Sequence, residues 1–423
     1  MILKAYKYRL YPTTEQAEFL NKTFGCCRWI YNRAVARVKP ENDRYREEYK
    51  QWKENGGPEP VRPKISQIIK ELNQEIKHLK KAEETAWLAE APSIPILASL
   101  RNYDTAWSNY FRGLKDGTIK AKKDMAINKH NKKGLPTDGK FWNYINDLGK
   151  PKFKDKAGHQ SFQFHQGYRV HFTKGTIDMP KLKGVKTVFH RTYEGISKTC
   201  TVSRTPSGKY FISILVETPG ELPELKPIRP ETSIGIHFGI TDMATTKKEI
   251  VIQTNRKLRD NLTKLKTLYK LASKKTKGSS NQKKAYQKVA KLYERITNQR
   301  NYILHALSNQ IVRNDEVDTI CLENWNKIEM MGDSRFAQGI SDVSWGRAMN
   351  FIEYKAKWAG KNVLKIDRFD PSAKTCSHCQ HVNDWVELKH RTWECTKCGT
   401  HHHRGKNSAR NIERMALSQV SKK

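Results

Sequence analysis

Two Cys-x-x-Cys pairs near the carboxyl end of the sequence constrain the fold of that region more than any other feature. The first pair is Cys376 and Cys379, the second is Cys395 and Cys398, and fifteen residues separate them. Each pair can place two thiolates on one edge of a tetrahedron, so the four sulfurs together match the ligand geometry of Zn²⁺. The spacing therefore predicts a four-cysteine Zn²⁺ site. Four protein ligands leave no open coordination position, which indicates a structural ion.

A redox-active dithiol is the alternative interpretation of such a pair, but two matched pairs favour a metal. Histidines beside the pairs are alternative ligands, although a histidine near a metal knuckle is more often solvated. These histidines are His378, His381, His401, His402 and His403. The other cysteines have no partner by spacing, do not suggest a disulfide scaffold, and are expected to be buried. They are Cys26, Cys27, Cys200 and Cys321.

The charge of the chain indicates its class of partner. The 423 residues include 79 Lys and Arg against 43 Asp and Glu, a formal net charge of +36. Small domains usually carry a net charge of about 2–8, so this excess requires a polyanionic partner, and we expect nucleic acid, RNA plus DNA ahead of DNA alone. A hydrophobic content of 37% excludes a disordered tail protein. No window approaches the ~20 apolar residues of a membrane span, and no secretory signal is visible.

Part of the positive charge lies in a predicted helical hairpin. From Arg256 to Arg300 the sequence has fifteen Lys and Arg against two acids. Leucines recur at steps of three and four residues from Leu258 to Leu271, and a Gly-Ser break follows at 277–280, so two amphipathic helices are expected. Phosphate contact is the favoured interpretation, and a solvated helix face is the alternative. The candidate contacts are Arg256, Lys257, Lys264, Lys274, Lys275, Lys283 and Lys284.

A second basic stretch covers residues 115–156, where glycines among the lysines predict loops. Phe141, Trp142 and Tyr144 lie within it. Basic residues interleaved with aromatic rings suit the binding of unpaired bases, and packing in a local core fits the pattern equally well. The candidate contacts to nucleic acid are Lys150, Lys152 and Lys154.

The amino-terminal part is expected to begin with a strand over residues 1–12. A helix capped by Thr13 or Thr14 follows, then a charged loop over about 38–64. Further helix is expected to about residue 112, with a kink near Pro92 and Pro95.

The remainder of the chain changes its periodicity twice. Alternation of period two over about 160–217 predicts an antiparallel barrel or sandwich. A proline-rich linker over 218–231 is the clearest domain boundary. Beyond the linker, strands are expected at 233–240, 249–253, 318–322 and 362–366, and helices at about 256–276, 281–312, 344–359 and 405–417.

Short motifs distributed over residues 1–418 accompany the cysteine pairs. They are Lys4-Ala-Tyr-Lys-Tyr-Arg-Leu-Tyr-Pro12, Ala82-Glu-Glu-Thr-Ala-Trp87-Leu, Gly149-Lys-Pro-Lys-Phe153, Met179-Pro-Lys-Leu182, Asp342-Val-Ser-Trp345-Gly and Asn407-Ser-Ala-Arg-Asn411-Ile. Together these motifs make the chain resemble the TnpB/OrfB family, the RNA-guided nucleases of bacterial insertion sequences that are related to type V CRISPR effectors.

The resemblance implies an α/β multidomain protein. An OB-like, wedge-type β-barrel would comprise residues 1–12 and 150–225, and a helical recognition lobe would comprise residues 13–149. A RuvC-like domain of the ribonuclease H fold would comprise residues 226–370 and 404–423. The zinc ribbon at 371–403 would be its target nucleic-acid-binding insert.

In this family, three carboxylates hold two Mg²⁺ ions in the RuvC-like centre. The corresponding positions here are His237, in a motif that otherwise carries Asp, Glu323, and Gly405. One carboxylate cannot organise two hard divalent cations, so neither a catalytic Mg²⁺ pair nor cleavage is expected. Asp242 is a candidate replacement, but the family usually has an acid there as well. Glu413 is poorly placed to replace the missing acid, because it lies about two turns past Gly405, some 12 Å along the helix.

The expected function is that of the nuclease-dead TnpB-like repressors. Such a protein binds a guide RNA of the omega type and double-stranded target DNA beside a short flanking motif, and represses transcription without cleavage. By resemblance, Ser93, Ser99 and Arg101 would read the flanking motif, and Trp345 is a further candidate contact. A monomeric ribonucleoprotein in the bacterial cytoplasm, associated with the nucleoid, is expected. The alternatives are an active endonuclease with a relocated acid and a guide-free DNA-binding accessory of transposition.

Overall fold

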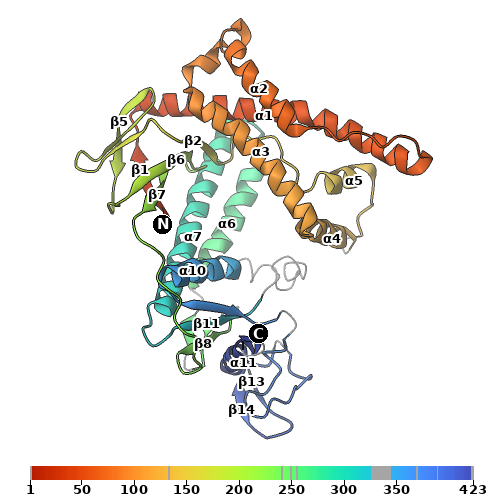
Figure 1. Cartoon of the computed structure of the whole chain (residues 1–423), viewed down its shortest axis with the longest axis vertical. Helices are drawn as coiled ribbons and strands as arrows, with labels where there is room; N and C mark the ends of the chain where they lie inside the picture. Colours follow the sequence, from red (N-terminus) through yellow and green to blue (C-terminus); the bar gives the residue numbers. More distant parts are fainter. Residues whose placement is uncertain are drawn as a thin grey trace. The chain divides into compact units, whose positions relative to one another are not determined.

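The computed structural model divides the chain into two compact units, Met1–Gly220 and Glu221–Lys423 (Figure 1). The division falls within the proline-rich segment 218–231. The structure describes residues 2–131, 134–239, 242–247, 250–253, 256–324, 344–367, 370–387 and 389–420. In this described part, no helix combines the length and the apolar composition that crossing a bilayer requires.

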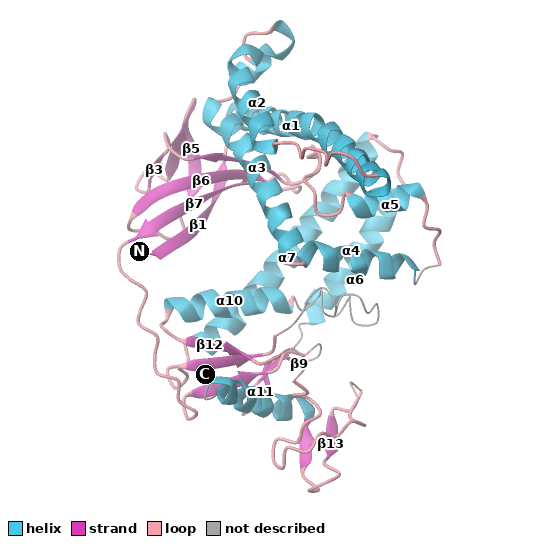
Figure 2. Ribbon diagram, turned by 45° about the vertical axis from the view of Figure 1, so that its right-hand side comes forward, coloured by secondary structure: helices cyan, strands magenta, loops and turns pink. Residues whose placement is uncertain are grey.

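A seven-stranded antiparallel sheet is the centre of the first unit, in the order β2-β6-β7-β1-β5-β4-β3. The strands are β1 (Ile2–Tyr11), β2 (Gln160–Phe164), β3 (Arg169–His171), β4 (Thr176–Met179), β5 (Leu182–Val188), β6 (Ile196–Arg204) and β7 (Tyr210–Thr218). Strand β1 pairs with β7 along its length, with Tyr6 opposite Ile214. The sheet is curled, and β2 and β3 are its two edges (Figure 2). It is therefore a single open, curled sheet, whereas a closed barrel or a sandwich was expected.

One face of this sheet is covered by the start of the first helix. The alternation along β7 buries Ile212 and Ile214, because successive strand residues point to opposite faces. Leu20 and Phe24 of α1 (Thr14–Asn55) pack into the same core. Thr13 caps this helix in a capping box: its hydroxyl accepts from the Gln16 amide. The predicted strand and helix start are confirmed.

Helix α1 continues through residues 38–55, so the loop predicted there is wrong. Charged residues at helical spacing explain the difference, because ion pairs between residues three or four apart stabilise a helix. Lys39 pairs with Asp43 at 3.4 Å, and Arg44 pairs with Glu48 at 3.6 Å. Pro40 lies inside the helix without ending it.

The remaining helices of the first unit are α2 (Ile65–Leu79), the 3₁₀ helix η1 (Glu83–Glu90), α3 (Ser93–Lys115), α4 (Thr118–Asn131) and α5 (Gly139–Asn146). Pro92 is the N-cap of α3 and Pro95 lies in its first turn, so the prolines mark a helix start and not a kink. Helices α4 and α5 occupy much of the stretch 115–156, which was predicted to be loops. Phe141 is buried, whereas Trp142 and Tyr144 are exposed.

A parallel three-stranded sheet in the order β12-β11-β8 is the centre of the second unit. The strands are β8 (Ser233–Ile236), β11 (Thr319–Leu322) and β12 (Asn362–Lys365). A second sheet pairs β9 (Asp242–Thr245) with β10 (Ile250–Gln253), and a bridge between His237 and Thr245 joins it to the end of β8. Helices α10 (Trp345–Trp358) and α11 (Arg404–Val420) lie on opposite sides of the parallel sheet (Figure 2).

Two further structures complete the second unit. Helices α6 (Arg256–Ser273) and α7 (Ser280–Val312) pack against each other, which confirms the predicted hairpin. Ser279 caps α7 by accepting a hydrogen bond from the Gln282 amide. The short strands β13 (Thr392–Glu394) and β14 (His401–His403) form an antiparallel pair within residues 371–403.

Candidate functional site

The four paired cysteines converge in the second unit. The sulfurs of Cys376, Cys379, Cys395 and Cys398 lie within 4.8 Å of one another. The Sγ atoms of Cys376 and Cys398 are 3.7 Å apart, and those of Cys379 and Cys395 are 3.6 Å apart. Tetrahedral Zn–S bonds of 2.3 Å separate sulfurs by about 3.8 Å, so the donor set fits Zn²⁺.

Polar groups lie close to two of the four sulfurs, those of Cys376 and Cys395. His402 Nε2 lies 3.1 Å from Cys376 Sγ, and the Asn383 amide nitrogen lies 3.6 Å from Cys395 Sγ. Burial opposes the ionisation of Cys395, but the backbone N–H groups of Lys397 and Cys398 outweigh it and lower the pKa of that thiol. His402 is thus placed beside a candidate ligand, outside the four-sulfur group. Asn383 was not singled out in the sequence, where an isolated Asn carries no signal.

Two asparagines of α11 hold the first cysteine loop. Asn407 accepts a hydrogen bond from the Ser377 amide at 2.9 Å and donates to the Thr375 carbonyl at 2.8 Å. Asn411 donates to the carbonyls of Ser372 and Thr375 at 2.9 and 2.6 Å. Both asparagine side chains are buried. The motif Asn-x-Ala-x-Asn therefore attaches the cysteine-bearing segment to the helix that begins at residue 404.

The residues at two of the three positions compared with catalytic acids lie together. His237 directly follows β8 and Glu323 directly follows β11. These strands are parallel neighbours, so both residues lie at the carboxyl end of the sheet. His237 Nδ1 lies 3.3 Å from Glu323 Oε1, and Ser372 Oγ donates to that same oxygen at 2.9 Å. Both His237 and Glu323 are largely buried, at 14% and 13% side-chain exposure. Arg404 also interacts electrostatically with Glu323.

Gly405, the third position, lies in the first turn of α11 and is buried. A Cβ atom placed on this glycine would stand 3.0 Å from Thr245 Oγ1 and 3.2 Å from Thr245 Cβ and Cγ2. Such contacts are tighter than ordinary van der Waals packing, so Thr245 occupies the space that a side chain at 405 needs. Neither Ser372 nor Thr245 was identified from the sequence, because only the tertiary structure brings them to these positions.

Two other carboxylates of this unit are paired with cations. Asp242 Oδ2 lies 3.4 Å from an Arg391 guanidinium nitrogen, and Glu413 Oε1 accepts from Lys247 at 2.8 Å. Across the part of the chain that the structure describes, the four cysteines are the one group of three or more His, Cys, Asp or Glu side chains close enough to share an ion. Among the described residues, this place holds one carboxylate, that of Glu323, beside the imidazole of His237.

Comparison with known proteins decides the family of the chain. A model of the OrfB helix-turn-helix domain of IS605 elements matches residues 1–50, a model of the OrfB "Probable transposase" matches 211–329, and a Cas12f1-like TNB domain matches 345–412. A protein of Streptomyces pristinaespiralis, named "Putative RNA-guided DNA endonuclease", is 30% identical over 415 residues, which cover 97% of this chain and 89% of that protein. The chain belongs to the TnpB/OrfB family.

Other members of this family are more distant. InsQ of Escherichia coli K12, named "Putative RNA-guided DNA endonuclease InsQ", is 26% identical over 97% of this chain and 91% of its own length. TnpB-like protein L770 of Acanthamoeba polyphaga mimivirus is 23% identical over 99% of this chain and 74% of its own length. Among solved structures, one titled "Cryo-EM structure of the Cas12f1-sgRNA-target DNA complex" shares 16% identity over 97% of this chain and 98% of that chain, with a TM-score of 0.42.

The three residues of α3 that were predicted to contact nucleic acid in this TnpB/OrfB chain differ in their exposure to solvent. Ser93 and Arg101 are exposed on α3, and Ser93 Oγ accepts from Lys80 at 2.8 Å. Ser99 is 3% exposed and donates to the Pro95 carbonyl, so it does not face solvent as expected. The reason is the helical period, which turns residue 99 toward the apolar core formed by Ile96 and its neighbours.

The three lysines predicted as contacts near residue 150 all lie after α5. Lys150 pairs with Asp147 at 3.0 Å. Lys152 Nζ lies 5.6 Å from the centre of the Tyr144 ring, and Lys154 Nζ lies 3.9 Å from that of Tyr31. Each ammonium group thus already has a carboxylate or an aromatic neighbour within the unit.

The basic hairpin of the second unit presents its lysines to solvent. The exposed candidates are Lys264, Lys274, Lys275, Lys283 and Lys284. The side chains of Arg256 and Lys257 lie outside the described residues, although α6 begins at Arg256. Trp345 is 5% exposed and packs in the core beside Ile352, and its Nε1 donates to the Gly239 carbonyl. This tryptophan is therefore a core residue and not the exposed contact that was expected, because burial of its large apolar ring is favourable.

Proposed function

We propose that this TnpB/OrfB chain is a guide-RNA-dependent DNA-binding protein that represses transcription without cutting its target. The family of the chain and its net charge of +36 support RNA and DNA as partners. In this proposal the guide pairs with one DNA strand and supplies the sequence specificity, while the protein reads a short flanking duplex motif. The complex is a monomeric ribonucleoprotein whose continued occupancy blocks transcription.

The domain assignment belongs to the same proposal. Residues 226–370 and 404–423 form the RuvC-like domain, and residues 371–403 form its zinc ribbon. The parallel strands β8 and β11 support this assignment, since they bring His237 and Glu323 together at the carboxyl end of the sheet. Zn²⁺ held by the four cysteines would cross-link the ribbon and take no part in chemistry, because the sulfurs fill its coordination sphere.

The single observation that carries the proposal is the environment of Glu323. Two Mg²⁺ ions need several anionic oxygens, and Glu323 is the one carboxylate among the three compared positions. Its Oε1 is contacted by His237 and Ser372, so the oxygen is held by protein groups. At Gly405, Thr245 stands where a side chain would begin. These contacts support a centre that has adapted to the loss of its metal ions.

The competing function is RNA-guided cleavage with a relocated acid, as the names of the relatives suggest. Asp242 and Glu413 are the acids considered for such a role. Both are engaged by cations, Arg391 and Lys247 respectively. A carboxylate neutralised by a nearby guanidinium or ammonium group is a poorer ligand for a divalent cation. This pairing favours binding without cleavage.

The test uses the full chain purified with the RNA that accompanies it. Sequencing of that RNA defines the guide, and a DNA duplex carrying the matching target is then offered with Mg²⁺ or Mn²⁺. The expected result is guide-dependent binding with both strands intact. A duplex with a scrambled target is the matched control for binding.

Two results would contradict the proposal. Strand breaks at guide-dependent positions would show a working nuclease, and their loss in Glu323→Ala would assign the cleavage to this centre. Unchanged target binding after ribonuclease treatment would show that the guide is unnecessary and would favour a guide-free accessory of transposition.

A further inference from the structure

A cavity of about 380 Å³ lies in the first unit, between α1, α3, the end of α5 and the segment that follows α5. Helix α1 contributes Val35 and Asn42, and α3 contributes Tyr103 and Trp107. This volume is at the lower end of the range for pockets that hold small ligands, about 300–1,000 Å³. It suits a ligand no larger than a nucleotide.

Two buried and two exposed aromatic rings line the cavity. Tyr103 and Trp107 are buried, at 1% and 5% exposure, and their rings meet edge to face at 6.4 Å. Tyr144 and Phe153 also line the cavity, but they are 49% and 56% exposed. Lys152 Nζ lies 5.6 Å from the centre of the Tyr144 ring, over one of its faces. The second face of such an exposed ring is the kind of flat apolar surface on which a planar partner stacks.

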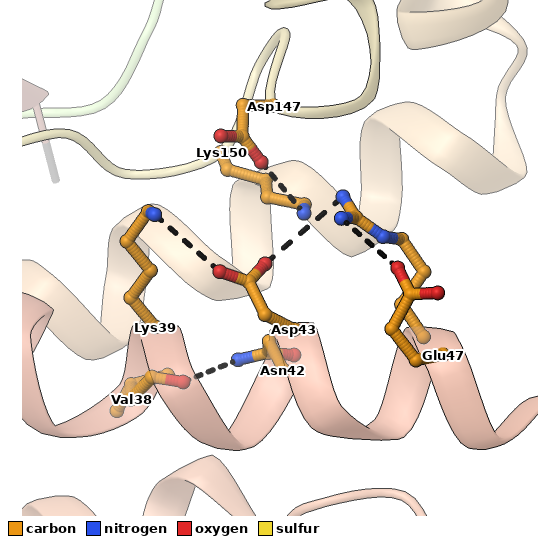
Figure 3. A network of polar contacts seen from close by, with 8 residues as sticks. Val38, Lys39, Asn42, Asp43, Glu47, Asp147 and Lys150 are labelled. Atoms are coloured by element: carbon orange, nitrogen blue, oxygen red, sulfur yellow. Dashed lines mark hydrogen bonds and ion pairs between the residues drawn. The ribbon is translucent and has the colours of Figure 1, made fainter. Parts of the chain in front are cut away.

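Charged groups of both signs line the same cavity. Figure 3 shows Asp43 on α1 paired with Lys39, and Asp147 paired with Lys150 on the segment opposite. Asn42 donates to the Val38 carbonyl, which leaves its amide oxygen as an acceptor. A planar ligand that carries both N–H donors and ring or carbonyl acceptors would find complementary partners here.

We propose that this cavity binds one unpaired nucleobase of a nucleic-acid strand, stacked on Tyr144 or Phe153 at the rim. The strand's phosphates would lie near the lysines that line the cavity, Lys39, Lys150 and Lys152. A base within a duplex is stacked between its neighbours and cannot enter a cavity of this size. The ligand is therefore a single-stranded segment, of RNA or of unwound DNA.

This pocket is independent of the centre at His237 and Glu323, because the pocket lies wholly within the first unit and those two residues lie in the second. Its test compares the double variant Tyr144→Ala/Phe153→Ala with Trp142→Ala in the full chain. Trp142 is the matched control, since it is 46% exposed in the same helix as Tyr144 and does not line the cavity. None of these rings is buried, so no variant leaves a hole in a core.

The probes are 20-nucleotide single strands of mixed sequence, one of RNA and one of DNA, and a 20-base-pair DNA duplex. Binding is measured at about 0.3 M salt, where non-specific phosphate contacts are weakened. Loss of base stacking is expected to lower the affinity of the double variant for a single strand by about 5- to 100-fold. Trp142→Ala and duplex binding should be unchanged. Whether the RNA or the DNA strand loses affinity identifies the source of the base.

A second readout does not depend on affinity. Single strands that contain 4-thiouridine or 4-thiothymidine are photo-crosslinked to the parent protein, and the crosslinked peptides are identified by mass spectrometry. Crosslinks within residues 144–153 are expected. The proposal fails if neither strand crosslinks there, if the double variant binds both single strands as tightly as Trp142→Ala does, or if the duplex loses as much affinity as the single strands.

Discussion

The imidazole of His237 and the carboxylate of Glu323 form a contact between the ends of two neighbouring parallel strands, with Nδ1 3.3 Å from Oε1. Ser372 Oγ donates to the same oxygen from the start of the cysteine-bearing segment. One carboxylate oxygen thus joins the end of a strand to the cysteine-bearing segment. An imidazole N–H can donate to a carboxylate oxygen, so a contact of this kind is favourable.

The first prediction concerns the energy of this contact. His237→Ala removes one partner of a largely buried carboxylate and should lower the free energy of unfolding by about 1–3 kcal/mol. Glu323→Gln should cost less when His237 is already absent, since the two residues act through one interaction. Urea unfolding of the two single variants and the double variant measures the coupling, which we expect to be about 0.5–3 kcal/mol. Additive effects would show that the contact contributes nothing to stability.

The second prediction concerns Gly405. Gly405→Ala places a methyl group against Thr245 and should destabilise the protein by about 1–3 kcal/mol through overpacking. Thr245→Ala removes Oγ1 and Cγ2, two of the three crowded atoms, and should recover part of that loss in the double variant. Gly25→Ala is the control, because a Cβ at this helical glycine meets nothing within 4 Å. It should be neutral or stabilising by up to about 1 kcal/mol. Equal effects at 25 and 405 would contradict the packing argument.

The third prediction concerns the metal. The purified chain should contain one Zn²⁺ per molecule by mass spectrometry of the metal, and Cys395→Ser should lose it. His378→Ala and His401→Ala should keep it, because neither side chain belongs to the group of four sulfurs. Removal of the ion with a chelator should make residues 371–403 sensitive to protease, since the ion links the two cysteine pairs. Zinc that survives in Cys395→Ser would refute the four-cysteine site.

The fourth prediction concerns the attachment of the ribbon to α11. Asn411→Ala leaves the Ser372 and Thr375 carbonyls without this donor in a buried place, which should cost about 1–3 kcal/mol. Arg410→Ala, at the preceding exposed position of the same helix, should be within about 0.5 kcal/mol of the parent protein. Thermal unfolding measures the stability. The zinc content shows whether Asn411 positions the cysteine-bearing segment or is needed for the metal site itself. If Asn411→Ala loses stability but keeps its zinc, the asparagine positions the ribbon and does not form the metal site.

The fifth prediction concerns alkaline pH. Burial raises the pKa of Tyr103 from 10.0 to about 12. The folded state therefore retains its proton more tightly than the unfolded state, and this contribution to stability is fully present below pH 10 and is lost as the pH rises toward 12. Tyr103→Phe cannot ionise, so its unfolding midpoint should fall less than that of the parent between pH 10 and 12. Tyr269→Phe, at an exposed ring, is the control. Parallel pH profiles for Tyr103→Phe and the parent would contradict the expected role of this phenol.

Local patterns predicted most of the regular elements, because the physical cause of each is local. Alternation of apolar residues places β7 in a sheet, and Thr13 with Gln16 starts α1. The prediction of a loop for the charged segment 38–55 was wrong. Its low hydrophobicity suggested a loop, but ion pairs at helical spacing stabilise a helix there. Polarity alone does not distinguish these two states.

The sequence by itself determined the family, the cysteine spacing and the identities of residues 237, 323 and 405, because these are properties of residue types at given positions. Tertiary structure decided what those residues contact. Ser372 reaches Glu323 from 49 residues away, and Thr245 meets Gly405 across the unit. The burial of Ser99 and Trp345 was decided there too. A residue's type sets what it can bind, but its neighbours across the fold determine which of its groups are still available.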